Sequence, residues 1–548
     1  MKKKRIVWVL LVPVLILGEF SFSPKNDYFP IARNLEIFAG LYKEVNTYYV
    51  DEINPNEVIK KGIDAMLKNL DPYTVYIPED LIEDYRTMAT GEYGGIGATT
   101  SIIDSEHVVV MIYEGYPAFE SGLRIGDKIL EVDDIPVTGL RHDELGRLLK
   151  GQSDTEVSMK VTRYGIDESI DLSLTRKNIK IESVTYQGML TDDIGMIKLS
   201  EFTNNSGKAV KDAAKTLKKL GATKLVLDLR DNPGGLLHES VNICNLFIPK
   251  DAVVVDTKGK IKDLNKTYAA LDAPFDTEIP LVVLISSGSA SASEIVAGVM
   301  QDYDRGVLIG EKSFGKGLVQ ATRPLSYNSQ LKVTTAKYYT PSGRCIQALD
   351  YSQRNDDGSV GKVPDSLKTT YYTTNGREVF DGGGVDPDIV IEKSKRPSIV
   401  AVLSQKGLLF SYASKYISDN DSIADPRSYE LSDATYSDFK AWVGEHSLEY
   451  ANKTEGTMDR LIASAKQENY YADIQSALDD LKASVVEQKN SDLDLFAADI
   501  KDVLEEEIIS RYYFEKGIIE STFNEDPNIL TAIEVLNDPA RYEEILVK

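Results

Sequence analysis

Cysteine and histidine are scarce in this 548-residue chain, and their scarcity excludes several classes of protein. Cys244 and Cys345 are the two cysteines and form no CxxC pair, which excludes a disulfide framework and a cysteine-ligated zinc site. A single disulfide would need an oxidising compartment, and two buried free thiols are the commoner outcome and the one we expect. The four histidines are scattered, so the sequence predicts no metal site.

The chain also lacks a surplus of positive charge. Its formal net charge is −24, and such a surface repels the phosphate backbone, so we expect no nucleic-acid partner. Residues 401–548 carry 30 acidic and 14 basic side chains, a pattern that usually marks solvated helix faces. The length is enough for roughly three or four domains.

Long apolar runs are rare, and the clearest one lies near the N-terminus. The basic segment Met1–Arg5 precedes the apolar stretch Ile6–Gly18, the arrangement of an export signal. The stretch is shorter than the roughly 20 residues that cross a bilayer comfortably, and no small-residue cleavage site follows it. Residues 1–24 are therefore expected to be an export signal or a membrane anchor, with the anchor slightly favoured. The body of the protein is expected outside the cytoplasm, on the periplasmic side of the inner membrane.

Hydrophobic periodicity predicts a multidomain α/β protein. Residues 25–92 repeat apolar side chains every three or four positions, which indicates an N-terminal helical module. Short alternating strands such as Val108–Ile112 fill residues 93–178 and predict a β-rich domain. Buried strands alternate with helices over residues 179–395, which indicates an α/β layer with a partly parallel sheet. Residues 396–548 are predicted to form an acidic helical C-terminal domain.

A glycine-rich turn opens the β-rich segment. Gly94, Gly95, Ile96 and Gly97 precede a strand, and their backbone N–H groups would suit a carboxylate, while a free strand edge would accept an extended peptide. Together with the segment 117–132, this turn resembles the carboxylate-binding loop of a PDZ domain. Arg163, at the end of a predicted strand, is a charge that would suit coupling to the following domain, although a solvated strand end is the commoner role.

Three further motifs follow in the α/β region. The segment Asp228–Gly235 ends a buried strand with a glycine pair whose N–H groups would suit an oxyanion. Residues 288–294 form a serine-rich turn, and Lys316 lies between two glycines. A serine hydroxyl needs a neighbouring base, and lysine is a base only when burial keeps it neutral. Ser291 and Glu294 also fit a helix-capping box, so the residues alone do not choose among the serines.

In this order, behind a PDZ-like domain, the motifs resemble those of the carboxyl-terminal processing proteases, also called tail-specific proteases. The resemblance covers roughly residues 31–395 and implies a serine endopeptidase with a crotonase/ClpP-like core and no cofactor. It also includes residues 337–344 and 381–388, which are expected to support the core. Carried over residue by residue, it implies these roles: Ser291 nucleophile, Lys316 general base, Gln320 positioning of the lysine, and Ala292 with Gly234 or Gly235 as oxyanion donors.

The residues leave two alternatives to a Ser–Lys protease open. His238 follows the glycine pair, and with Asp231 or Glu239 it would complete a Ser–His–Asp arrangement. A catalytically silent PDZ scaffold that binds peptides is the alternative from another functional class. The expected partners are proteins or peptides with accessible C-termini. The acidic tail would suit an adaptor protein, a homo-oligomer contact or a lid, and its periodicity does not choose among them.

Overall fold

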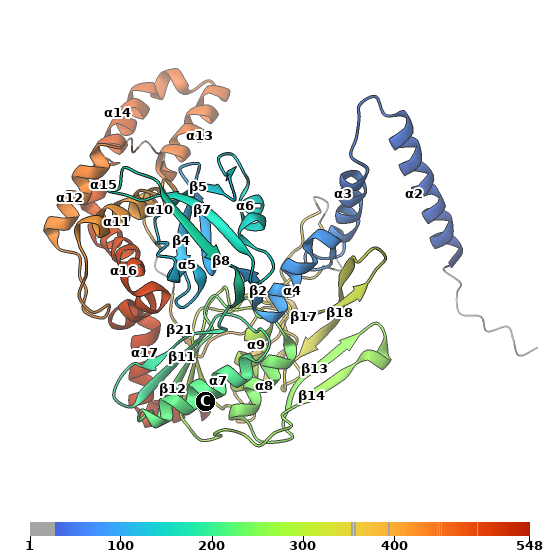
Figure 1. Ribbon diagram of the computed structural model, residues 1–548. Coiled ribbons are helices and arrows are strands. Elements are labelled where there is room, and N and C mark those ends of the chain that lie inside the picture. The colour runs from blue at the N-terminus through green and yellow to red at the C-terminus, as the bar shows by residue number, and fades with distance from the viewer. Residues whose placement is uncertain are drawn as a thin grey trace, which may run out of the picture. The chain divides into compact units, whose positions relative to one another are not determined.

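The computed structural model describes residues 28–547, apart from 352–353, 356–357, 393–394, 447, 449, 451 and 490 (Figure 1). The predicted export signal or anchor at residues 1–24 therefore lies outside the described residues. None of the helices in the described part is long and apolar enough to cross a membrane. Cys244 and Cys345 are both free thiols, as expected, but only Cys244 is fully buried, whereas Cys345 is half-buried.

The described chain divides into two compact units, and the smaller one holds the N-terminal helices. It contains α2 (Tyr28–Tyr48) and α3 (Pro55–Lys68), which confirms the predicted helical pattern. Asn54 caps α3, since its side chain accepts from the backbone N–H of Asn56 at 3.0 Å. The helical pattern ends at Asp71, whose carboxylate accepts the backbone N–H groups of the next turn. The short strand β1 (Val75–Ile77) follows.

The larger unit begins with a PDZ-type β domain. Its main sheet has the order β3-β4-β5-β7-β8, with β6 paired to β5. The sheet strands are β3 (Ala98–Ile103), β4 (Glu106–Ile112), β5 (Lys128–Val132), β6 (Ile135–Pro136), β7 (Glu156–Thr162) and β8 (Ile170–Thr175). The helices of this region are η1 (Glu79–Leu81), α4 (Ile82–Thr90), α5 (Pro117–Glu120) and α6 (His142–Leu149). A two-stranded ribbon of β2 (Glu92–Gly95) and β9 (Lys177–Lys180) joins the start and end of the domain. Alternate residues of β7, Val157, Met159 and Val161, are buried in the core, as the alternating pattern predicts.

The α/β core is built on a six-stranded sheet of order β10-β11-β12-β15-β16-β21. The strands are β10 (Val184–Met189), β11 (Ile194–Leu199), β12 (Lys224–Asp228), β15 (Leu281–Ile285), β16 (Val307–Gly310) and β21 (Ile389–Val390). All neighbouring pairs are parallel except β10 with β11. Central strands of such a sheet are covered on both faces, which explains why the whole of β15 is apolar and buried.

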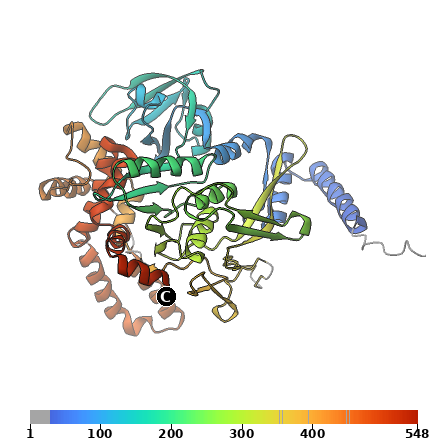
Figure 2. The same ribbon diagram turned by 90° about the horizontal axis from the view of Figure 1, so that it is seen from below.

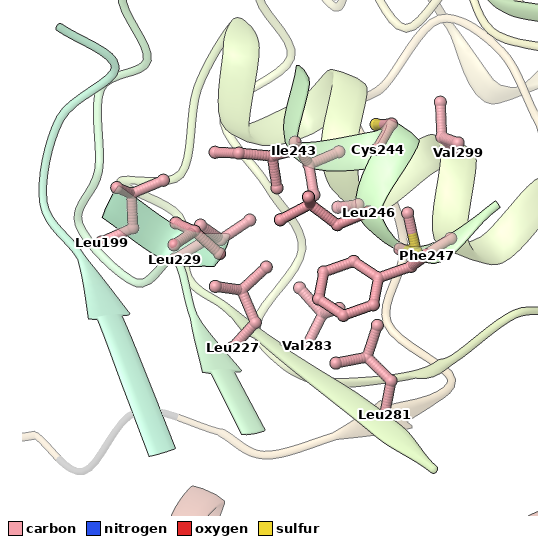
Figure 3. Packing of buried hydrophobic residues seen from close by; sticks show 14 of the residues in the cluster. Leu199, Leu227, Leu229, Ile243, Cys244, Leu246, Phe247, Leu281, Val283 and Val299 are labelled. Atoms are coloured by element: carbon pink, nitrogen blue, oxygen red, sulfur yellow. The ribbon is translucent and has the colours of Figure 1, made fainter. Parts of the chain in front are cut away.

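Three helices cover one face of this sheet: α7 (Ser206–Lys219), α8 (Leu237–Phe247) and α9 (Ala292–Asp302). Figure 3 shows Leu227 and Val283 of the strands packed against Ile243 and Phe247 of α8. Further strands and turns extend the core: β13 (Val253–Gly259), η2 (Lys262–Leu264), β14 (Lys266–Ala269), β17 (Leu318–Pro324), β18 (Gln330–Tyr339), η3 (Asp365–Leu367), β19 (Thr370–Tyr372) and β20 (Glu378–Phe380).

The C-terminal region is helical, as predicted, and it has two parts. The elements α10 (Ser398–Gln405), α11 (Leu408–Asp419), α12 (Asp433–Gly444), α13 (Lys453–Gln467), α14 (Tyr471–Lys489), α15 (Asp492–Leu495), α16 (Ala497–Ser521) and η4 (Thr522–Asn524) come first. Helices α10, α11, α12 and α16 share a core of their own. The last two helices, α17 (Pro527–Asn537) and α18 (Pro539–Val547), pack instead on the second face of the six-stranded sheet (Figure 2). The final helices of the acidic region thus complete the α/β core.

Candidate active site

The three motifs of the α/β region meet at one edge of the parallel sheet. β12 ends at Asp228 and leads into the glycine pair, β15 ends at Ile285 and leads into the serine turn, and β16 ends at Gly310 before the lysine segment. Loops that follow the carboxyl ends of parallel strands gather at the same edge, which is where α/β sheets place their sites. The sheet topology thus brings together segments that are about 25 to 80 residues apart in the sequence.

The structure distinguishes Ser291 from the other serines of the turn. Ser289 and Ser293 are fully buried, and their hydroxyls donate to the carbonyls of Leu229 at 2.7 Å and Asn232 at 2.9 Å. Ser291 is half-buried, and its hydroxyl makes no such bond to a carbonyl in the described chain. Its backbone has φ 56° and ψ −110°, a conformation that non-glycine residues rarely adopt. Strain of this kind is typical of a nucleophile on a sharp strand-to-helix turn.

Ser291 is also the N-cap of α9, so the predicted capping box with Glu294 is present. The Glu294 side chain is fully buried and accepts four hydrogen bonds. Its Oε2 accepts the backbone N–H of Ser291 at 2.8 Å and that of Lys316 at 2.9 Å, and its Oε1 accepts from Gly315 and Ser313. Burial has the largest effect and raises the pKa of Glu294 above its ordinary value, although these hydrogen bonds act to lower it. Because all four partners donate, they stabilise the carboxylate form.

Lys316 is half-buried in the loop that leads into β17. The neighbouring glycines are required by close packing. A side chain at Gly315 would place its Cβ 2.4 Å from the Cβ of Ala348, at a φ of 88°, and one at Gly317 would lie 2.8 Å from the backbone nitrogen of Gln347. These contacts fix the backbone on both sides of the lysine. Gln320 lies on β17, where its amide donates to the hydroxyl of Thr334 at 3.2 Å.

The glycine pair lies directly against the serine turn. A Cβ at Gly234 would be 2.8 Å from the backbone nitrogen of Ala292, so only glycine permits this approach. The N–H of Gly234 donates to the side chain of Asn232 at 2.9 Å. The N–H groups of Gly235 and Ala292 make no hydrogen bond within the described residues. In this conformation Gly235, not Gly234, is therefore the member of the pair with a backbone donor available beside Ala292.

An ion pair that the sequence reasoning did not single out supports the glycine loop. The guanidinium of Arg230 donates to both carboxylate oxygens of the fully buried Asp228, at 2.9 and 2.8 Å. Burial alone would raise the pKa of Asp228, but the charges of Arg230 and Lys198 outweigh it and bring the pKa to about 2. Both residues belong to the segment Asp228–Gly235. An acidic and a basic residue at the end of a buried strand could have indicated this ion pair from the sequence.

The Ser–His–Asp alternative finds no support in these contacts. The side chain of His238 is 59% exposed, and its Nε2 lies 3.4 Å from a carboxylate oxygen of Glu239. Glu239 itself accepts the backbone N–H groups of Asn205 and Gly207 at the start of α7. Asp231 accepts from the hydroxyl of Ser286. None of these bonds leads to Ser291.

The two downstream segments of the resemblance support the site. The hydroxyl of Tyr338 donates to the carbonyl of Ser291 at 3.1 Å. Arg344 is fully buried and pairs with Asp302, at the end of α9, at 2.9 Å. The N–H of Val385 donates to the hydroxyl of Ser313, which in turn donates to Glu294.

Of the predicted carboxylate loop of the β domain, Gly94 and Gly95 end β2 and pair with β9, and Ile96 and Gly97 lie between β2 and β3. The carbonyls of Gly94, Ile96 and Gly97 accept backbone hydrogen bonds from Gly151, Ala118 and Tyr113, respectively. The N–H groups of Ile96 and Gly97 have no such partner among the described residues. In the described sheet β3 pairs with β4 alone, so its other edge is open to an added strand.

Arg163 lies within the same β domain and not at the α/β core. It donates through two nitrogens to Asp127, each at 2.7 Å, and to the carbonyl of Gly122 at 2.8 Å. Asp127 is fully buried, so the pair fixes a turn of the PDZ fold. In this structure the bonds of Arg163 thus stay inside its own domain.

Fold and site together define a serine peptidase of α/β type that carries a PDZ domain, and comparison with known proteins agrees. The sequence model of Peptidase family S41 matches residues 193–353, a PDZ domain model matches 108–163, and a model described as "Probable PDZ-protease, C-terminal helical domain" matches 399–536. The Carboxy-terminal-processing protease of Bartonella bacilliformis is 36% identical over 351 residues, which cover 63% of this chain and 79% of that one. The chain belongs to peptidase family S41, and is a carboxy-terminal-processing serine protease.

The chain is also similar to two other proteins. The Probable CtpA-like serine protease of Staphylococcus aureus (strain MRSA252) is 36% identical over 315 residues, which cover 57% of this chain and 62% of that one. The solved photosystem II D1 C-terminal processing protease is 27% identical, covers 66% of this chain and 94% of its own, and aligns with a TM-score of 0.35. A likeness at that score carries no weight for the details of the site.

Proposed function

We propose that Ser291 and Lys316 form the catalytic dyad of this protease. The single observation that carries the proposal is the bond of both backbone N–H groups to Oε2 of Glu294, which fixes the two segments against each other. The N–H groups of Gly235 and Ala292, which make no hydrogen bond among the described residues, would serve as the oxyanion hole. Gln320 lies on the strand that follows the lysine and would position the side chain of Lys316.

The proposed reaction is acyl transfer in two stages. Neutral Lys316 takes the hydroxyl proton of Ser291 while the serine oxygen attacks the scissile carbonyl, and the oxyanion is held by the two backbone donors. The lysine then gives that proton to the leaving amine as the C–N bond breaks. In the second stage Lys316 takes a proton from the water that attacks the acyl carbon. It then gives this proton to the serine oxygen as the ester C–O bond breaks, which releases the carboxylic acid and restores both side chains. No cofactor is needed for these steps.

The test is cleavage of an unstructured protein, followed on a gel. Ser291→Ala and Lys316→Ala are each expected to abolish the fragments while far-ultraviolet circular dichroism stays as in the wild type. His238→Ala, an exposed residue of the same edge, is the matched control and is expected to cleave normally. Full activity of Lys316→Ala with loss in His238→Ala would refute the dyad, and tight binding without turnover by the wild type would favour the peptide-binding scaffold.

The PDZ domain is proposed to select substrates by their C-terminal carboxylate. The open edge of β3 would pair with an extended peptide, and the N–H groups of Ile96 and Gly97 would receive its carboxylate. Amidating the C-terminus of a bound peptide is expected to weaken its affinity about tenfold or more, since charge-assisted hydrogen bonds are lost. Equal affinity for the acid and the amide would exclude carboxylate recognition.

The protein is further proposed to act outside the cytoplasm, on the periplasmic side of the inner membrane. The support is the basic segment Met1–Arg5 followed by the apolar stretch Ile6–Gly18. Fractionation of cells that express the full chain is expected to place it in the membrane or periplasmic fraction. An adaptor protein and a homo-oligomer are the proposed partners of the acidic region, and analytical ultracentrifugation of the purified chain tests the oligomer.

A further inference from the structure

One acidic residue of the C-terminal region contacts the active-site edge of the sheet. Asp526 is the N-cap of α17, and its Oδ1 accepts the backbone N–H groups of Asn528 and Ile529. Its other oxygen, Oδ2, accepts from Arg230 at 2.5 Å, nearly 300 positions earlier in the chain. Both side chains are largely buried, with 13% and 17% exposed. A charged hydrogen bond in such a place is stronger than one on the surface.

Helix α17 is held firmly enough to make this contact specific. Its apolar residues Ile529, Ala532 and Val535 are buried against strands of the six-stranded sheet, including Val226 of β12 and Leu284 of β15. The same helix contacts β15 and β16 of the sheet, and Figure 1 shows it beside the sheet. Asp526 is therefore presented at the carboxyl end of β12 by a packed helix.

Arg230 transmits the contact to the glycine loop. It stands between Leu229 and Asn232, whose carbonyls accept the hydroxyls of Ser289 and Ser293. Asn232 in turn accepts the N–H of Gly234 through its side chain. The guanidinium of Arg230 has two carboxylate partners, one from its own strand and one from α17. Removing Asp526 leaves one side of that guanidinium buried and unpaired, so the loop can shift.

We infer that Asp526 is a positioning residue for the oxyanion hole, so that the C-terminal helical region forms part of the active site's support. Asp526 touches no substrate. It holds Arg230, and through it the backbone of the loop that aims the Gly235 N–H at the carbonyl oxygen. The inference rests on the proposed roles of Ser291 and Gly235.

The test uses the full chain with Asp526→Asn and Asp526→Ser. Both substitutions keep an N-cap oxygen for α17 and remove the negative charge that faces Arg230. We expect kcat to fall about tenfold, less than the roughly 10²- to 10³-fold that follows removal of an oxyanion donor itself. KM should stay within about twofold, because ground-state binding is untouched. Inhibition by a peptide aldehyde, whose carbonyl oxygen becomes the oxyanion when the serine adds, should weaken in parallel with kcat.

The matched control is Asn537→Ala. Asn537 ends the same helix and accepts from Lys224, at the opposite end of the same strand β12, at 2.7 Å. It should lower the melting temperature as Asp526→Asn does and leave kcat unchanged. Equal losses of kcat in the two variants, or a change in KM alone, would overturn the inference. Activity in Ser291→Ala would instead refute the proposed function, so the two failures are distinguishable.

Discussion

The backbone N–H groups of Ser291 and Lys316 donate to the same carboxylate oxygen, Oε2 of Glu294, at 2.8 and 2.9 Å. Two loops from different strands are thus tied at one buried atom. A carboxylate that accepts hydrogen bonds from several N–H groups holds the loops in place, because moving either loop breaks a charged hydrogen bond. The residue that completes the capping box of α9 also sets the position of the proposed base.

Glu294→Gln should lower both stability and activity. The amide turns one acceptor oxygen into a donor, so buried donors such as the Lys316 N–H lose their partner. We expect the free energy of unfolding to fall by about 2–4 kcal/mol, from one or two unsatisfied buried groups, and kcat to fall at least about tenfold. Urea unfolding and peptide hydrolysis measure the two effects.

The control is Glu239→Gln, which removes another buried helix-capping carboxylate, that of α7. The free energy of unfolding of the Glu239→Gln protein should fall by a similar amount, and its kcat should stay unchanged. If the two variants lost activity equally, Glu294 would have no special connection to the dyad.

Alanine substitutions of the three serines of the turn should differ in their effects on stability and on activity. Ser289→Ala removes a hydroxyl donor to the carbonyl of Leu229 and the acceptor of the Ser286 N–H, and Ser293→Ala removes a hydroxyl donor to the carbonyl of Asn232. Each substitution should cost about 1 kcal/mol of unfolding free energy. Ser291→Ala should change stability by less than about 1 kcal/mol and abolish hydrolysis. Thermal unfolding and a burst assay for the acyl-enzyme check this. Hydrolysis by the Ser291→Ala protein would assign the nucleophile elsewhere.

Asp228 should make the protein sensitive to strong acid. Its pKa in the folded state is about 2, below the ordinary value of 3.8. A depressed pKa gives stability that is full above pH 4 and is lost as the pH falls towards 2, an amount of roughly 2 kcal/mol. Asp228→Asn should therefore be less stable at neutral pH and show a shallower loss between pH 4 and 2. Parallel curves for variant and wild type, from urea unfolding at each pH, would rule this out.

The last two helices should be indispensable, unlike the α13–α14 hairpin. Deleting residues 527–548 uncovers Val226, Leu284 and Ile309 on one face of the sheet. Each such side chain is worth about 1.5–3 kcal/mol when buried, so the truncated chain is expected to be insoluble. Replacing residues 453–489 by a short linker should yield a soluble, cooperatively folding protein, because α13 and α14 pack chiefly on each other. Soluble expression and size-exclusion chromatography of the two truncated proteins test this prediction. A soluble monomer that lacks residues 527–548 would contradict it.

Much of this architecture was predictable because local patterns decide local structure. The spacing of apolar residues in α7 predicts a helix, and the continuous apolar run of β15 predicts a buried strand. Neither prediction depends on the surrounding sequence. The order of the glycine, serine and lysine motifs was equally visible. The sequence could not show that Gly234 has its N–H bonded to Asn232, because that choice depends on the loop's final conformation.

Local sequence patterns specify the element types, their order, the family and the candidate residues, since each depends on neighbours in the chain. Tertiary structure alone decided which serine keeps its hydroxyl clear of backbone carbonyls. It also decided that one carboxylate, Glu294, joins Ser291 to Lys316, and that the acidic tail reaches Arg230 through Asp526. These contacts join segments tens to hundreds of residues apart, and only the packing of helices against the sheet brings such segments within hydrogen-bonding distance.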